Sequence, residues 1–88
     1  MTRFLSPYNN REVVRMDIGE RMKSLRQDRD IRQKEIAAAL GLSRSAYSNY
    51  ENGYNAVPLD ILAALARYYH TSADYLLGLT DNPAPPQK

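Results

Sequence analysis

A set of hydrogen-bonding side chains recurs at three- and four-residue spacing between residues 43 and 52. On a helix this spacing puts them on one face, and all are short or cationic: Arg44, Ser45, Ser48, Asn49 and Asn52. Such side chains can read base edges in the major groove of DNA, where Arg pairs with guanine and Asn with adenine. An ordinary solvated helix face tends to carry Glu and Lys, which form helices better than Ser and Asn do. The composition of this face therefore favours nucleic-acid reading over a plain surface role.

The sequence offers little for catalysis or metal binding. It has no cysteine and a single histidine, His70, which excludes thiol nucleophiles, thiolate metal sites and multi-histidine sites within one chain. It also lacks a Gly-rich phosphate-binding loop. We therefore expect a protein that is not an enzyme and that needs neither a cofactor nor a metal ion.

The polar face belongs to a segment with the pattern of two short helices and a tight turn, residues 33–53. Ala37 is small where two helices would cross closely, and Gly41 allows the positive φ angle that a helix end requires. Leu42 follows as an apolar plug, and Ser43 can cap the next helix. This arrangement predicts a helix-turn-helix unit whose second helix carries the polar face.

Three further helices are expected to support this unit. Asp17 with Glu20 resembles a capping box and starts a first helix that runs to about residue 29. Asp30 is expected to start the second helix. Pro58 fits the first turn of a fourth helix over residues 59–69, which is apolar nearly all round and is predicted to be buried. Ser72 caps a short fifth helix. The predicted fold is a compact, all-α, five-helix domain.

Size and charge agree with one small binding domain. The chain has 88 residues and a net charge of +2, and ten of its twelve Lys and Arg residues lie within positions 1–44. We expect an N-terminal arm over residues 1–16, the domain over 17–80 and a frayed Pro-rich tail over 81–88. No apolar run approaches the roughly 18 residues of a membrane span. The expected location is the cytoplasm, with no membrane partner.

Three motifs carry a resemblance to a known family: IGERMKSLR, RQKEIAAALGLSRSAYSNYENG and VPLDILAALARYYHTSADYLLGL. Residues 18–79 resemble the phage-repressor and Cro-like helix-turn-helix proteins, also called the Xre family. The resemblance implies a five-helix lambda-repressor-like domain whose third helix enters the major groove. It also implies a two-fold dimer on a palindromic operator.

The resemblance assigns roles to individual residues. The positions that it matches to base reading are Arg44, Ser45, Ser48 and Asn49. Those expected to contact DNA phosphates, from the resemblance or as replacements for its usual contacts, are Arg32, Gln33, Ser43, Asn52, Tyr54 and Asn55. Gln33 can also brace a base-reading side chain. Arg26 and Glu51 match an ion pair that we interpret as structural, because breaking a partly buried pair leaves one charge uncompensated.

The sequence departs from the family pattern at several positions. Arg32 stands where the family often has the Ser or Thr that caps the second helix, so Asp30 is expected to replace that cap. The loop at Tyr54 and Asn55 lacks the cations that some members have there. Tyr47 replaces an aliphatic residue, and we favour a core position for it over contact with a sugar-phosphate edge.

The function expected from these features is sequence-specific binding of double-stranded DNA by a transcriptional regulator, with a repressor preferred over an activator. The candidate homodimer surface is Tyr75, Leu76 and Leu79, although the same residues suit core packing or a partner protein. The alternative function is an antitoxin-like or other protein-interaction module that uses this C-terminal surface. The chain ends soon after the fifth helix, so we expect no ligand-sensing or peptidase domain.

Overall fold

The computed structural model describes residues 17–86, and this part of the chain is all-α, as expected. Its five helices are α1 (Ile18–Asp28), α2 (Gln33–Ala39), α3 (Arg44–Glu51), α4 (Leu59–Tyr69) and α5 (Ala73–Leu76). The predicted arm over residues 1–16 lies outside the described residues and stays a prediction. No helix between residues 17 and 86 is both long and apolar enough to cross a membrane.

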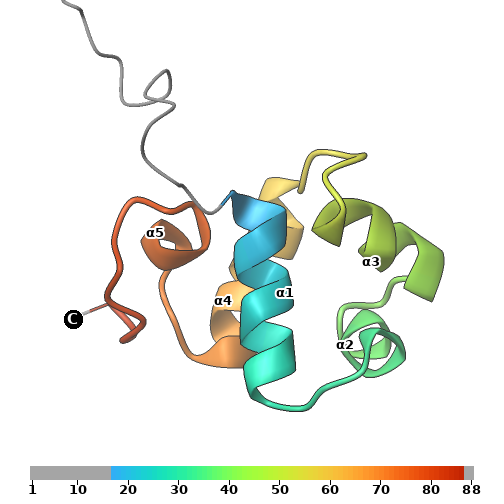
Figure 1. Cartoon of the computed structure of the whole chain (residues 1–88), viewed down its shortest axis with the longest axis horizontal. Helices are drawn as coiled ribbons and strands as arrows, with labels where there is room; N and C mark the ends of the chain where they lie inside the picture. The colour runs from blue at the N-terminus through green and yellow to red at the C-terminus, as the bar shows by residue number, and fades with distance from the viewer. Residues whose placement is uncertain (1–16, 87–88) are drawn as a thin grey trace, which may run out of the picture.

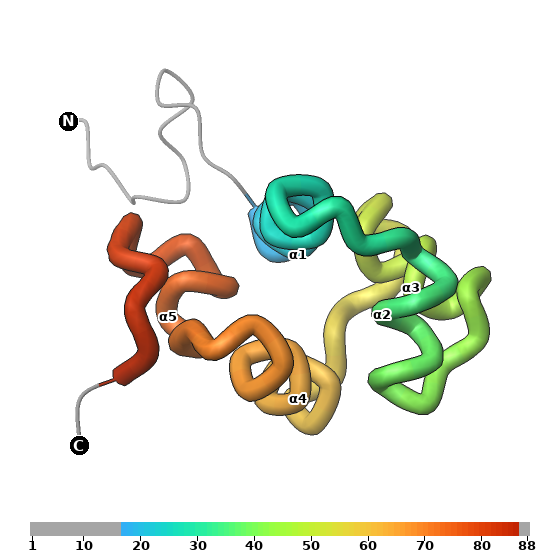
Figure 2. The backbone as a smooth tube through the Cα atoms, turned by 90° about the horizontal axis from the view of Figure 1, so that it is seen from below, coloured from blue at the N-terminus to red at the C-terminus, as the bar shows by residue number. Residues whose placement is uncertain are grey.

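Helix α1 lies between the two ends of the domain. Figures 1 and 2 show α2 and α3 on one side of α1, and α5 with the C-terminal segment on the other. Helix α1 contacts both α3 and α5, whereas α2 packs on α3 and α4 packs on α5. The relative position of the two ends therefore depends on how α1 packs.

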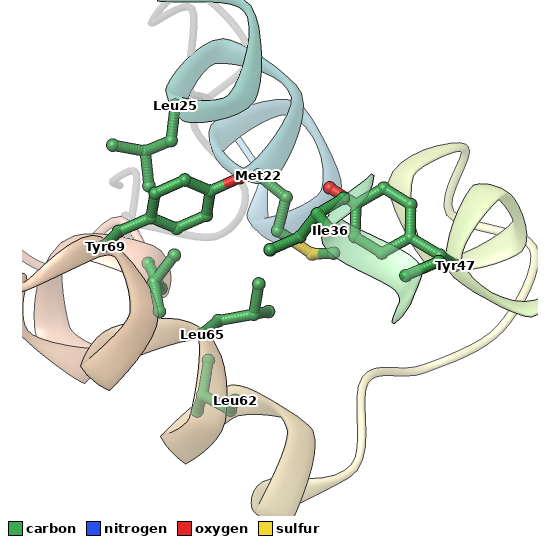
Figure 3. Close-up of a cluster of buried hydrophobic side chains, with 9 residues drawn as sticks. Met22, Leu25, Ile36, Tyr47, Leu62, Leu65 and Tyr69 are labelled. Atoms are coloured by element: carbon green, nitrogen blue, oxygen red, sulfur yellow. The ribbon is translucent and has the colours of Figure 1, made fainter. Parts of the chain in front are cut away.

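A single core joins all five helices. Met22 lies between the side chains of α4 and those of α2 and α3 in Figure 3. The buried apolar side chains are Met22, Leu25, Ile36, Ala37, Tyr47, Leu62, Leu65, Tyr69 and Leu76. Burial of a large apolar side chain contributes about 1.5–3 kcal/mol, so these residues supply most of the stability available to so small a domain.

Local capping explains where several helices begin. The predicted capping box of α1 is confirmed, because Glu20 N donates to the Asp17 carboxylate at 2.8 Å and Asp17 N donates back to Glu20 at 3.2 Å. Ser43 Oγ accepts from Ala46 N at 3.1 Å, and Ser72 Oγ accepts from Tyr75 N at 3.0 Å. Each hydroxyl satisfies one of the amide groups that a helix leaves unpaired at its start.

The expectation that Asp30 starts the second helix is wrong. Asp30 has a φ of 55° and ends α1 instead, because Ile31 N donates to the Arg26 carbonyl and Asp30 N to the Gln27 carbonyl. This pair of bonds is a Schellman motif, in which Asp can adopt the left-handed conformation more readily than most residues. Helix α2 starts after Arg32, without a side-chain cap.

One expectation about the C-terminal half is also wrong. Helix α4 is not buried all round, because Leu59 is 81% exposed. The residues of α4 that face the core are Leu62, Leu65 and Tyr69. Residues 81–86 are exposed but return to the α4–α5 corner, where the Thr71 hydroxyl donates to the Pro83 carbonyl at 2.7 Å, and their fraying stays a prediction. The buried Thr71 hydroxyl needs a partner, and this segment provides one.

Candidate nucleic-acid interface

The turn between α2 and α3 has the geometry that its sequence predicts. Gly41 has a φ of 72°, and the amide of Leu42 donates to the Ala37 carbonyl at 2.8 Å. Ala37 is buried, which lets α2 and α3 approach closely. These contacts hold the first turn of α3 against α2, so that the outer face of α3 is presented by a rigid support.

The polar face of α3 is accessible along its length. Arg44 and Ser45 are exposed, and Ser48 and Asn49 are partly exposed. Tyr47 lies on the opposite side and is fully buried, which confirms its expected core position. Within the described part of the chain, the side chains of Arg44, Ser45 and Asn49 make no intramolecular hydrogen bond. Their donors and acceptors are therefore available to a ligand.

The residues expected at phosphates border this face. Ser43 caps α3 with its oxygen and keeps its hydroxyl proton free to donate. Asn52 donates to Ser48 Oγ at 3.3 Å across the last turn. Tyr54 and Asn55 are exposed in the following loop, where both backbone amides donate to the Asn49 carbonyl. The start of α3 and the loop after it thus flank the polar face on both sides.

A positively charged hollow lies at the start of α2 and α3. It has a volume of about 430 Å³ and is lined by Arg26, Arg32, Gln33, Lys34 and Arg44. The charges of Arg32, Lys34 and Arg44 attract anions there, and guanidinium groups suit phosphate oxygens, whereas Arg26 is already paired with Glu51. Lys34 was not predicted as a lining residue, although its place in the run Arg32-Gln33-Lys34 was the available signal.

The inner side of α3 is clamped through the carboxylate of Glu51. Arg26 donates to it from Nε at 2.6 Å and from a terminal nitrogen at 3.2 Å, and Gln33 Nε2 donates at 3.1 Å. The Tyr47 hydroxyl donates at 2.6 Å. The Arg26 and Glu51 side chains are only 12% and 1% exposed. This network, which we call the Glu51 clamp, connects α1, α2 and α3.

The Glu51 clamp keeps its carboxylate ionised. Burial alone would raise the pKa of Glu51, but the hydrogen bonds from Arg26, Tyr47 and Gln33 outweigh burial and lower this pKa below its usual value. The hydrogen bond to Glu51 raises the pKa of Arg26. Burial and the bond to Glu51 raise the pKa of Tyr47, so its phenol stays neutral and donates. The donor role of Tyr47 was not predicted from the sequence, although its four-residue spacing from Glu51 on a helix was the available signal.

The candidate dimer residues do not form one surface. Leu76 is fully buried in the core, so its assignment to a dimer surface is wrong: the short α5 turns this side chain inward. Tyr75 is partly buried beneath Arg21, whose guanidinium carbon lies 4.0 Å from the ring centre. Leu79 is 63% exposed, and Leu77 beside it is exposed too. The exposed leucines that follow α5 are therefore Leu77 and Leu79.

Comparison with known proteins agrees with this architecture. The helix-turn-helix family model matches residues 22–76. An uncharacterised helix-turn-helix transcriptional regulator of Bacillus subtilis, YobD, is 41% identical over 66 residues, which cover 75% of this chain and 59% of YobD. The antitoxin PezA of Streptococcus pneumoniae is 34% identical over 61 residues, which cover 69% of this chain and 39% of PezA. The chain thus spans less than two thirds of either relative.

The fold matches a solved repressor. The P22 c2 repressor in complex with a synthetic operator aligns with a TM-score of 0.65 and 33% identity, over 69% of this chain and 92% of that one. The helix-turn-helix match covers more than half of the chain and includes α2, the turn and α3. The protein therefore belongs to the phage-repressor and Cro-like family of helix-turn-helix proteins.

Proposed function

We propose that this protein binds double-stranded DNA sequence-specifically, with α3 in the major groove, and acts as a transcriptional repressor. The observation that carries the proposal is the outer face of α3. Within residues 17–86 the side chains of Arg44, Ser45 and Asn49 have no hydrogen-bond partner, while the Glu51 clamp holds the helix from behind. Free donors and acceptors on a rigid helix can select among base pairs. The operator named in the P22 c2 complex supports the same ligand class.

In this proposal the contacts divide into two groups. Arg44, Ser45, Ser48 and Asn49 read base edges, and the first and last of these can make bidentate pairs with guanine and adenine. The phosphates on either side are bound by Arg32, Gln33, Ser43, Asn52, Tyr54 and Asn55. The positively charged hollow supports a phosphate position at the start of α2, with Lys34 as an additional cation there.

We also propose that the protein acts as a homodimer on a palindromic operator. A dimer places two α3 helices about one helical turn of DNA apart. Of the predicted dimer residues, Leu79 is exposed, and Leu77 two residues earlier is exposed as well. Burying this pair between two copies would remove it from water, which favours association.

A protein-interaction function is the second candidate, and two observations favour it. The exposed residues Leu77 and Leu79 directly follow α5, and α5 lies at the end of the domain opposite α3 (Figure 1). A partner bound there would leave the polar face free. One relative is an antitoxin, PezA. If this function is the main one, the protein selects no DNA motif and retains a partner protein in a pull-down.

The first experiment is selection from a random duplex library at about 150 mM salt, a concentration at which non-specific phosphate binding is weak. The expected result is a palindromic motif with half-sites about one helical turn apart. A featureless result would contradict sequence-specific binding.

Two asparagine variants then separate base from phosphate contacts. Asn49→Ala should weaken binding to the selected motif by about 1–3 kcal/mol and relax the preference at one base pair. Asn55→Ala, the matched control, should weaken binding to the motif and to random DNA alike. Arg32→Ala should flatten the slope of log affinity against log salt by about 0.9. Equal losses on both DNAs for Asn49→Ala would contradict its base-reading role.

A further inference from the structure

Gly19 lies where α1 passes closest to the end of the polar-faced helix. It is a buried residue in the first turn of α1. A Cβ atom added there would lie 2.8 Å from the Tyr50 carbonyl oxygen and 3.0 Å from the Glu51 carbonyl carbon, and closer still to the Glu51 carbonyl oxygen. All three neighbours are backbone atoms of the last turn of α3, so no side-chain rotation can relieve the overlap.

Glycine at this position is explained by space and not by backbone conformation. Gly19 is helical, and its φ is not among the positive ones. Within a helix, Ala is favoured over Gly by about 0.5–1 kcal/mol, so helix propensity alone predicts that Ala at position 19 would stabilise the domain. The close approach of the α1 and α3 backbones predicts instead that Ala at position 19 destabilises the domain.

The contact at Gly19 and the Glu51 clamp act on the same turn of α3. The backbone of Glu51 lies against Gly19, and its side chain accepts the hydrogen bonds of Arg26 and Gln33. Asn49 lies only two residues earlier on this eight-residue helix. A shift of the last turn therefore displaces the polar face, because a helix this short moves as one body.

The size of the displacement can be estimated from the contacts. Ordinary van der Waals contact begins at 3.4 Å, so the Tyr50 oxygen, at 2.8 Å, would have to retreat by more than half an ångström. Hydrogen bonds between N–H and O span only about 2.7–3.2 Å. A shift of that size moves a well-made base contact out of this range.

We propose that Gly19 is a positioning residue for DNA reading: its missing side chain sets how close α3 lies to α1, and thereby where α3 presents its polar face to the groove. The inference rests on the proposed DNA-binding function. Gly19 itself is buried against α3 and is not accessible to a ligand. It therefore acts on specificity through the placement of Asn49 and its neighbours.

The test compares Gly19→Ala with Gln27→Ala, an exposed and uncharged position on the same helix. Dissociation constants are measured for the selected motif and for a random duplex, with wild type in parallel. A variant that is only less folded loses the same factor on both DNAs, so the ratio of the two constants is unaffected. If Gly19→Ala is largely unfolded, the titrations are repeated with trimethylamine N-oxide until the helical circular dichroism signal returns.

For Gly19→Ala we expect the ratio of random to motif dissociation constants to fall by about tenfold to a hundredfold, the effect of spoiling one or two base contacts. Gln27→Ala should keep the wild-type ratio. An unchanged ratio for Gly19→Ala, with wild type still discriminating, overturns the positioning role and leaves the proposed function standing. A wild-type ratio near one overturns both.

Discussion

Replacing Glu51 with glutamine removes the only negative charge from the clamp behind α3 while keeping almost the same shape. Wild-type Glu51 accepts two hydrogen bonds from Arg26 and one each from Gln33 and Tyr47. A glutamine side chain has one acceptor oxygen and an amide group that is a donor only. Some of these donors must therefore lose their partner, and the Arg26 guanidinium stays nearly buried without a counter-charge.

The expected cost follows from the burial of the pair. Removing one partner of a buried ion pair typically costs about 3–5 kcal/mol. Arg26 retains a bond to the Ile31 carbonyl at 2.9 Å and its side chain is 12% exposed, which puts the expected loss near the lower limit, at about 3 kcal/mol. A domain of this size has a total stability of about 4–10 kcal/mol. Glu51→Gln should therefore lower Tm by about 12–24 °C.

The assay is urea and thermal unfolding followed by circular dichroism at pH 7, with Glu35→Gln as the matched control. Glu35 is an exposed carboxylate on α2, so the same chemical change there should alter stability by less than about 0.5 kcal/mol. The double variant Arg26→Met with Glu51→Gln should lose less stability than the sum of the losses in the two single variants, because each single variant leaves one member of the pair without its partner. If Glu51→Gln destabilises no more than Glu35→Gln does, the clamp does not hold α3.

Three further predictions follow from other contacts. Tyr47→Phe should lower the free energy of unfolding by about 1.5–3 kcal/mol, because it removes a hydrogen bond to a charged group. Urea unfolding measures this loss, with Tyr50→Phe as the control. Equal losses in the two variants would count against the bond. Because the pKa of Glu51 is lowered in the folded state, its ionised carboxylate stabilises the fold at pH values above the unfolded-state pKa of about 4.3. This stabilisation is lost as the pH falls through the folded-state pKa. The stability difference between wild type and Glu51→Gln should therefore shrink in urea titrations from pH 7 to pH 2.5, and a constant difference would contradict this. Thr71→Val should lower the free energy of unfolding by about 0.5–1.5 kcal/mol and speed proteolysis at residues 81–86. Unchanged cleavage would mean that the hydrogen bond to Pro83 does not hold this segment.

Local signals in the sequence predicted most of the elements correctly. The Asp17–Glu20 capping box and the glycine at position 41 depend on residues a few positions apart, so their geometry is fixed by neighbours along the chain. Asp30 is the exception, because a carboxylate can either cap a following helix or occupy the left-handed end of the preceding one. The hydrogen bonds that the amides of Asp30 and Ile31 donate to α1 carbonyl groups decide between these two roles and put Asp30 at the end of α1.

Burial was harder to predict than helix position. Leu59 and Leu76 both belong to the helical apolar pattern of their own segments. Leu59 is nevertheless 81% exposed, whereas Leu76 is fully buried. Hydrophobic periodicity shows which residues can be buried and not which face of a short helix meets a neighbour. Helix α5 has four residues, too few for a periodic pattern to define its inner side.

The sequence alone determined the helix-turn-helix unit and the chemistry of its polar face, because turn residues and i, i+4 spacings act over short distances along the chain. Only the tertiary structure decided that Glu51 collects donors from α1, α2 and α3, and that Gly19 meets the backbone of α3. Those contacts join positions up to 32 residues apart. They exist only once the core has packed, because the packing of Met22, Tyr47 and the other buried side chains fixes the distance between the helices.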